Sequence, residues 1–190
     1  MRRSAQRSER QPPRTAGPAE PGPLEGARFD ELFEQCAGDV HGYALSLLGD
    51  RASAEDVTAL AFERLYRSRA RLDRGRGTPR AWLFTIARNA ALDELRRRKH
   101  RPLLLADVER SGGSDEALEA LERRDTVRAG LAALTLRERE IVLLKFHGQL
   151  TNGELARAMG ISESNVGTRL HRALTRLREL CRERETQEAA

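Results

Sequence analysis

An aromatic ring, an amide and a block of arginines recur at helical spacing between Pro79 and Arg101. Trp82, Asn89 and Arg96 stand at positions i, i+7 and i+14, so they share one face of a helix. On such a face a ring stacks on bases, an amide reads base edges and guanidinium groups hold phosphates, which suits an unpaired nucleic-acid strand. The same residues are also typical of a solvated, basic helix end whose tryptophan packs in the core. The pattern therefore leaves open both a strand-binding face and an ordinary helix surface.

A second group of candidate contacts follows a short helix, a glycine turn and a capped longer helix. Thr151 opens a capping box with Glu154, Gly160 makes the turn, and Ser162 caps the longer helix. This order is typical of a helix-turn-helix, whose second helix enters the major groove of duplex DNA. The candidate base and phosphate contacts on its outward face are Ser162, Ser164, Asn165, Thr168, Arg169 and Arg172. The alternative, an ordinary helical hairpin with a polar surface, is disfavoured by two consecutive capping boxes in this region.

Three helices are expected to position the candidate contacts between Pro79 and Arg101. An apolar series at helical spacing begins at Phe29 and ends at Gly49. The residues from Ser53 to Asp56 have the form of a capping box for a second helix. Pro79 suits the first turn of the third. No run alternates with period two, so the sequence predicts an all-α fold.

The chain is expected to form two small helical domains joined by a flexible acidic linker. Residues 1–26 lack large apolar side chains and predict a disordered basic tail. The first domain covers 27–101, and the linker covers 102–125, which are rich in glycine, serine and acidic residues. The second domain, 126–182, contains the helix-turn-helix, and 183–190 form a short tail.

Composition narrows the classes of function. The net charge of +5 favours a polyanionic partner only weakly, because acidic residues are nearly as numerous as basic ones. Cys36 and Cys181 lie far apart without histidine at metal spacing, so we expect unpaired thiols in a reducing cytosol and no metal or other cofactor. Scattered histidines and non-convergent carboxylates argue against an enzyme such as a nuclease. No stretch is apolar enough to span a bilayer, so we expect a cytoplasmic protein without membrane insertion.

Both halves together resemble the extracytoplasmic-function (ECF) sigma factors of bacterial RNA polymerase, over nearly the whole chain apart from the tail and linker. Residues 28–101 are similar to region 2, most specifically in Trp82-Leu83…Ile86-Ala87-Arg88-Asn89…Asp93-Glu94-Leu95-Arg96-Arg97. Residues 126–180 are similar to region 4, in Glu154-Leu155-Ala156…Met159-Gly160-Ile161-Ser162…Val166…Arg169-Leu170-His171-Arg172-Ala173.

The resemblance implies a non-enzymatic protein that binds core RNA polymerase, at the beta-prime clamp helices and the beta flap, and directs promoter-specific initiation. Region 4 would read the −35 element as duplex DNA through the recognition helix. Region 2 would melt the −10 element and hold its strand through Arg80, Trp82, Arg88, Asn89, Arg96, Arg97, Arg98 and Lys99. Core polymerase would bind to Glu55, Asp56, Val57, Ala59, Leu60 and Glu63. Promoter DNA and, where one exists, an anti-sigma factor complete the expected partners.

Two positions depart from the family pattern. Family members carry a glutamine and an acidic residue where this chain has Ala59 and Leu60, which predicts weaker binding to core polymerase. Gly167 stands where relatives often place a lysine, which costs about 1 kcal/mol of helix propensity and removes a phosphate contact. The alternative function is a helix-turn-helix transcriptional regulator that does not bind polymerase, but it leaves Trp82 to Arg101 unexplained.

Overall fold

The computed structural model describes residues 26–69, 77–98 and 115–188, and its elements are α-helices throughout these ranges. The predicted all-α class is therefore confirmed. The helices in chain order are α1 (Gly26–Leu48), α2 (Arg51–Ser68), α3 (Pro79–Arg98), α4 (Asp115–Ala133), α5 (Leu136–Phe146), α6 (Asn152–Met159) and α7 (Glu163–Glu188). Residues 1–25 of the predicted tail, and 102–114 of the predicted linker, lie outside the described residues.

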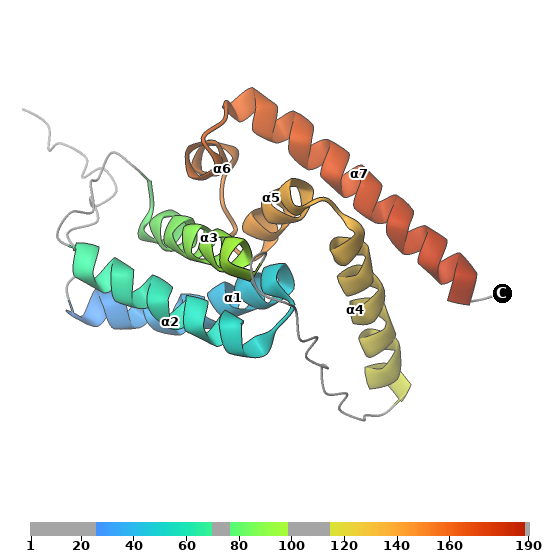
Figure 1. Ribbon diagram of the computed structural model, residues 1–190, viewed down its shortest axis with the longest axis horizontal. Helices are drawn as coiled ribbons and strands as arrows, with labels where there is room; N and C mark the ends of the chain where they lie inside the picture. Colours follow the sequence, from blue (N-terminus) through green and yellow to red (C-terminus); the bar gives the residue numbers. More distant parts are fainter. Residues whose placement is uncertain (1–25, 70–76, 99–114, 189–190) are drawn as a thin grey trace, which may run out of the picture.

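Helices α1, α2 and α3 pack on one another as a three-helix bundle (Figure 1). Its core contains Tyr43, Leu65 and Phe84, which are fully buried, and the rings of Tyr43 and Phe84 meet edge to face. Pro79 is the first residue of α3, and Thr78 caps that helix by accepting a hydrogen bond from the backbone N–H of Ala81 at 3.2 Å. The bundle thus fixes the rotation of α3, the helix that carries the predicted strand contacts.

The start of α2 differs from the sequence-based expectation. The capping box predicted at Ser53 is wrong, because Asp50 is the N-cap and accepts a hydrogen bond from the backbone N–H of Ser53 at 3.2 Å. Gly49 follows the last residue of α1 in the left-handed region with a φ of +73°, and Asp50, in an extended conformation, completes the connection to α2. The helix therefore begins at Arg51, before the motif that we expected to open it.

Helices α4 to α7 form the second domain and contain the predicted helix-turn-helix. Both predicted capping boxes are present, one at Thr135 and one at Thr151. Gly160 ends α6 with a φ of +67°, and Ser162 accepts a hydrogen bond from the backbone N–H of Asn165 at 3.3 Å. Helix α4 begins at Asp115 and α7 ends at Glu188, so helix extends past both boundaries that the sequence suggested for this domain.

The two domains contact each other directly, which nothing in the sequence led us to expect. Helix α5 lies against α1, and α6 lies near the N-terminal end of α3 (Figure 1). Buried apolar residues from both domains belong to one continuous cluster. The two groups of predicted DNA contacts therefore sit in one packed body rather than on independent units.

Candidate nucleic-acid and polymerase interfaces

The outward face of α7 is open to solvent along its first three turns. Ser164, Thr168 and Arg172 stand at i, i+4 and i+8 and are exposed, as is the capping residue Ser162. Asn165 and Arg169 are half-buried and joined to each other, because Arg169 Nε donates a hydrogen bond to Asn165 Oδ1 at 2.9 Å. All six residues predicted from the sequence thus lie on one side of the recognition helix.

The opposite side of α7 fixes this face in place. Val166 and Ala173 are fully buried, and α7 packs on α4, α5 and α6. The capping box of α6 holds the preceding turn: Glu154 accepts hydrogen bonds from the backbone N–H of Thr151 at 2.9 Å and from the Thr78 hydroxyl at 2.7 Å. Burial would raise the pKa of Glu154, but these hydrogen bonds outweigh it and lower that pKa. An ionised carboxylate therefore stabilises the start of the helix-turn-helix.

The predicted strand contacts on α3 divide into two groups, and the first is accessible. Asn89 is exposed. The side chains of Arg96 and Arg97 are 71% and 69% exposed and pair with Asp93 and Glu94 one turn earlier. Such surface pairs are weak, so a phosphate can displace them. Lys99 lies outside the described residues.

Three arginines of the predicted strand site are held by the protein itself. The first, Arg98, belongs to the fold of the first domain. It donates to the backbone carbonyl of Leu48 at 2.9 Å and forms ion pairs with Asp50 and Glu94. These contacts join the end of α3 to the α1–α2 connection. Asp50, which also accepts from Ser53, consequently has a pKa below its ordinary value, with the Ser53 hydrogen bond as the largest cause and Arg98 as a further one.

The second, Arg80, lies at the junction of the two domains, and each of its three guanidinium nitrogens has an acceptor. Nε donates to the Gly148 carbonyl at 2.7 Å, and Nη2 donates to the His147 carbonyl at 2.7 Å. Nη2 also pairs with Asp39 of α1 at 2.5 Å, and Nη1 donates to Cys36 Sγ at 3.2 Å. The two carbonyls lie at the C-terminal end of α5. A helix has unsatisfied carbonyl acceptors and a partial negative charge at this end, so a guanidinium is stabilised there.

The third, Arg88, forms an ion pair across the domain boundary with Glu140 of α5. The Arg88 side chain is 17% exposed and that of Glu140 only 4%. The hydroxyl of Tyr43 is buried beside them and, among the described residues, has no hydrogen-bond partner. Burial raises the pKa of this hydroxyl, and the neighbouring Glu140 adds to the effect. Sequence reasoning missed this polar cluster between the domains.

The remaining predicted strand contact, Trp82, also faces the second domain. It is half-buried and lines a cavity with Thr85 of α3 and with Glu154, Arg157 and Ala158 of α6. The tryptophan is therefore neither a fully buried core residue nor a fully exposed stacking platform, because residues of α6 line the same cavity.

The predicted polymerase-binding helix α2 presents a charged outer face. Glu55, Asp56, Ala59 and Glu63 are exposed and Leu60 is half-buried. Val57 differs from the others because it is only 3% exposed and packs in the core of the bundle, so it positions the helix rather than offering a contact.

An aromatic patch that we did not predict continues this face. Tyr66 is 48% exposed and follows Ala59 and Glu63 at helical spacing, and Phe33 of α1 is 47% exposed. Tyr66 contacts the half-buried Phe29 at a ring–ring distance of 5.2 Å, and Phe33 contacts the buried Phe62 at 4.8 Å. The helical spacing of Tyr66 and Ala59 was the sequence signal that could have identified this aromatic patch.

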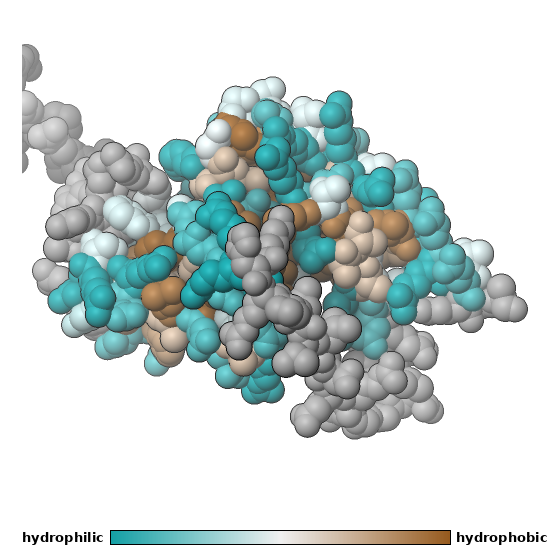
Figure 2. All heavy atoms as spheres, viewed as in Figure 1, coloured by the Kyte–Doolittle hydropathy of each residue, from teal (hydrophilic) through white to brown (hydrophobic). Residues whose placement is uncertain are grey.

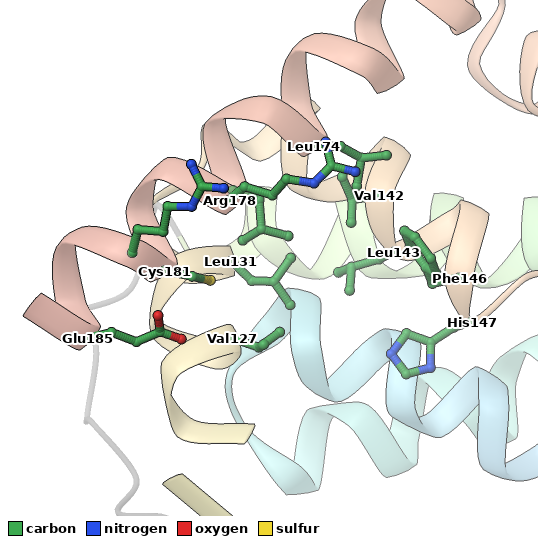
Figure 3. A pocket seen from close by; sticks show the side chains of 12 residues that line it. Val127, Leu131, Val142, Leu143, Phe146, His147, Leu174, Arg178, Cys181 and Glu185 are labelled. Atoms are coloured by element: carbon green, nitrogen blue, oxygen red, sulfur yellow. The ribbon is translucent and has the colours of Figure 1, made fainter. Parts of the chain in front are cut away.

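A second apolar surface lies between α4, α5 and α7. Figure 2 shows hydrophobic side chains there, flanked by hydrophilic ones. The groove has a volume of about 640 Å³, and Leu131, Leu143 and Phe146 point into it (Figure 3). Arg178 and Arg182 stand along its α7 side. Phe146 is 61% exposed, which is unusual for a phenylalanine on a folded domain.

Within residues 26–69, 77–98 and 115–188, no group of three histidine, cysteine or acidic side chains is placed to hold a metal ion. In the same ranges no helix is both long and apolar enough to cross a bilayer. Cys36 is buried and Cys181 partly buried, and both are free thiols whose pKa is raised chiefly by burial.

Two structures of other proteins share this architecture. The sigma factor RpoE, solved in complex with the anti-sigma factor NepR from Bartonella quintana, is similar with a TM-score of 0.67. The match has 20% sequence identity and covers 83% of this chain and 98% of that one. CnrH, solved in complex with the cytosolic domain of CnrY, gives a TM-score of 0.60 at 25% identity, covering 81% of this chain and 87% of that one.

Sequence comparison identifies the family. The family models Sigma-70 region 2 and Sigma-70, region 4 match residues 32–101 and 116–177. The ECF RNA polymerase sigma factor SigM of Bacillus subtilis is 29% identical over 155 residues, which cover 80% of this chain and 94% of that protein. SigL of Mycobacterium tuberculosis, an ECF RNA polymerase sigma factor, is 32% identical over 159 residues, covering 81% and 89%. The chain belongs to the ECF sigma factors of RNA polymerase.

Proposed function

We propose that this sigma factor divides promoter recognition between α7, which reads duplex DNA at the −35 element, and α3, which holds the melted strand of the −10 element. As a member of its family the chain binds core RNA polymerase and directs promoter-specific transcription. Sigma factors as a family are not enzymes, so what this chain supplies is binding energy and specificity. We place its action in the cytoplasm, where polymerase and promoters meet.

The observation that best supports this division is the solvent-exposed polar row on α7. Ser164, Thr168 and Arg172 project from a helix whose other side is anchored in the core. Residues near the N-terminus of a recognition helix reach base edges in the major groove, and later ones reach phosphates. Asn165 and Arg169 are suited to base readout, because an amide pairs with adenine and a guanidinium with guanine. Their mutual hydrogen bond keeps both side chains oriented before DNA arrives.

On α3, the accessible residues are suited to an unpaired strand. Asn89 offers an amide to a base edge, and Arg96 and Arg97 offer charge to the phosphates. Trp82, Arg80 and Arg88 have suitable chemistry, but the second domain occupies them or stands against them. Arg98 is engaged within the first domain, so we assign it to the stability of α3 rather than to the strand.

For polymerase binding, we propose the outer face of α2 for the beta-prime clamp helices. Its exposed acidic residues and the neighbouring Tyr66 offer both charge and apolar area. The methyl group of Ala59 offers no hydrogen bond there, so we expect Ala59→Gln to strengthen binding to core polymerase several-fold, by about 1 kcal/mol. Titration of labelled chain with core polymerase measures this, and an unchanged affinity would show that Ala59 is not at the interface.

We propose the groove between α4, α5 and α7 for the beta flap. Its apolar floor and its arginine rim are suited to an apolar helix that carries acidic residues. An anti-sigma factor is a further proposed partner, because the structural neighbours RpoE and CnrH were both solved with bound partner proteins, NepR being named an anti-sigma factor.

Run-off transcription with core RNA polymerase on a promoter library tests the proposed function. We expect specific initiation that depends on this chain and is lost in Asn89→Ala and in Arg169→Ala. Asn89 is exposed, and the half-buried Arg169 bonds to Asn165 on its own helix, so we expect both variants to keep the fold. Specific duplex binding by the chain without any core-dependent initiation would contradict the proposal and favour the regulator that does not bind polymerase.

A further inference from the structure

The aromatic patch of Phe33 and Tyr66 is fixed in place by the rings beneath it. Phe33 meets Phe62 edge to face at 4.8 Å between ring centroids, and Tyr66 meets Phe29 at 5.2 Å. Phe29 and Phe62 are themselves in edge-to-face contact at 6.3 Å, so the four rings join the start of α1 to the end of α2. Phe33 and Tyr66 nevertheless remain 47% and 48% exposed. Adjoining exposed rings on a rigid support indicate a docking surface rather than scattered surface residues.

The two sides of the aromatic patch differ in charge. The first turns of α1 carry more acidic than basic exposed residues, with Asp30, Glu31 and Glu34 against Arg28. On α2, the guanidinium carbon of Arg69 lies 3.8 Å from the centroid of the Tyr66 ring, and Arg67 pairs with Glu63 at 2.7 Å. The α1 side therefore favours an occupant that carries basic residues.

The chain itself contains a segment whose composition suits this patch. Five of its seven prolines lie shortly before α1 begins at Gly26, and these are Pro12, Pro13, Pro18, Pro21 and Pro23. Proline-rich segments favour the extended polyproline II helix, which docks on aromatic surfaces at a low cost in conformational entropy. Arg10 and Arg14 flank the first pair of prolines, so the segment combines proline rings with basic charge.

The place where this segment joins the fold puts it within reach of the patch. From Gly26 to Phe33, α1 rises by roughly 10 Å, whereas residues 12–23 span roughly 35 Å as polyproline II. The segment is therefore long enough to turn back over Phe33 and Tyr66. A short tether gives an effective concentration in the millimolar range, so even a contact with a dissociation constant of about 1 mM is well populated.

We propose that the proline-rich segment, residues 12–23, docks on the aromatic patch of its own chain, with its prolines against Phe33 and Tyr66 and its basic residues toward the acidic side of α1. Tyr66 adjoins the face of α2 that we propose for the beta-prime clamp helices, so the docked segment competes with core polymerase. This competition rests on the proposed function, whereas the docking itself does not.

Tyr66 supplies a direct readout, because the chain has two tyrosines and the other, Tyr43, is fully buried in the core. Labelling with meta-fluorotyrosine gives one fluorine resonance for each, and Tyr66→Phe assigns them. The change in chemical shift between light and heavy water reports contact with solvent. Tyr66 therefore measures the docking, and Tyr43 is the internal reference. All measurements use the full-length chain.

Replacing the tail prolines with serine removes the proposed contact but keeps the length and charge of the segment. The substitutions are Pro12→Ser, Pro13→Ser, Pro18→Ser, Pro21→Ser and Pro23→Ser. We expect the solvent shift of Tyr66 to increase and that of Tyr43 to stay unchanged. The matched control changes neither prolines nor charge and should alter neither shift; it combines Ala5→Ser, Ala16→Ser and Ala19→Ser.

A synthetic peptide of residues 10–25 tests the same contact in trans. Added at millimolar concentration to the proline-to-serine chain, it should restore the protection of Tyr66, because it supplies the missing prolines. A peptide with serine in place of each proline should not. Titration of labelled chain with core polymerase measures the competition. If about three quarters of the free chains are docked, the proline-to-serine chain should bind core polymerase about fourfold more tightly.

An unchanged solvent shift of Tyr66 in the proline-to-serine chain would overturn the docking. A solvent shift of the unmodified chain that rises on dilution would also overturn it, because the segment would then cover a second copy. Greater solvent contact of Tyr66 without tighter binding to core polymerase would overturn the competition. In each case, core-dependent run-off by the unmodified chain would show that the proposed function still stands.

Discussion

The two DNA-binding faces of this sigma factor use the same kinds of side chain but differ in their availability. On α7 the polar row is exposed, and the side chains of its half-buried members, Asn165 and Arg169, are hydrogen-bonded to each other. On α3 the arginines nearest the second domain are engaged by carbonyls and carboxylates, while Arg96 and Arg97 further along stay exposed. Side-chain chemistry alone therefore does not tell which arginines are ready to bind DNA. The acceptors around each guanidinium decide it.

The difference follows from where each helix lies in the packed body. Helix α7 is at the periphery and packs on its own domain through one side. Helix α3 is central, with α1 and α2 around one side and α6 near its start. A central helix has fewer exposed positions, so its arginines meet protein acceptors before they meet phosphates. Four substitutions test this comparison, from the largest expected effect to the smallest.

Arg169→Ala should weaken the binding of α7 to promoter duplex by about 2 kcal/mol, or roughly thirtyfold, because a base contact in the major groove is lost. Stability should change by less than about 0.5 kcal/mol, since the variant loses a local hydrogen bond to Asn165 on the same helix. Electrophoretic mobility shift on a duplex and thermal unfolding measure the two effects. A large loss of stability with unchanged duplex binding would reverse the roles that we assign to the two faces.

Arg88→Ala should cost no more than about 1.5 kcal/mol of stability in urea unfolding. A permanently buried pair that loses one partner costs about 3–5 kcal/mol, because a charge is stranded in the interior. Here the pair lies where the two domains meet and the Arg88 side chain is 17% exposed, so water can enter beside Glu140 in the variant and the loss is smaller. A cost of 3 kcal/mol or more would show that the interface is a fixed core.

Asp50→Ala should destabilise the first domain by about 1 kcal/mol, because α2 loses its N-cap and Arg98 loses a partner. The pKa of Asp50 is lowered in the folded protein, so its contribution is fully present above the ordinary aspartate value of about 4 and is lost as the pH falls below it. Unfolding at pH 7 and pH 3 measures this. An equal difference between variant and parent at both pH values would contradict the role of the ionised carboxylate.

Gly167→Lys should have the smallest effect and should act on α7 alone. An added Cβ meets nothing within 4 Å at this position, so the substitution fits without strain. A new phosphate contact should strengthen duplex binding by about 0.5–1 kcal/mol and make it more dependent on salt. Gly167→Ala is the control for helix propensity, which by itself stabilises α7 by a similar amount. Altered binding to the single strand would mean that the two faces are not separate.

Local signals in the sequence predicted most of the fold. The capping boxes at Thr135 and Thr151 and the turn at Gly160 depend on residues three or four positions apart, so they are visible in a single sequence. The start of α2 was harder to predict, because Asp50 and Ser53 are both good N-cap residues and lie one turn apart. The structure uses Asp50. The exposed face of α7 follows from the same helical periodicity that places Val166 in the core.

The contact between the two domains could not be predicted in the same way. Arg80 binds the carbonyls of His147 and Gly148, and every residue has a carbonyl, so no residue type marks such an acceptor. Glu140 was the one available signal, since it is an acidic residue beside the buried series that begins at Ile141. Even so, its partner lies on another helix of another domain. Helical periodicity identifies a buried side but not what covers it.

The most direct test of the difference between the two faces is to measure duplex and strand binding on the same full-length chain. A promoter duplex selected by run-off transcription and a fluorescein-labelled, random-sequence DNA single strand are titrated in parallel with the unmodified chain and with Glu140→Gln. We predict that Glu140→Gln tightens strand binding several-fold, because it weakens the ion pair that holds Arg88, and leaves duplex binding within about twofold. An equal shift for both probes, or a shift for the duplex alone, would contradict the account.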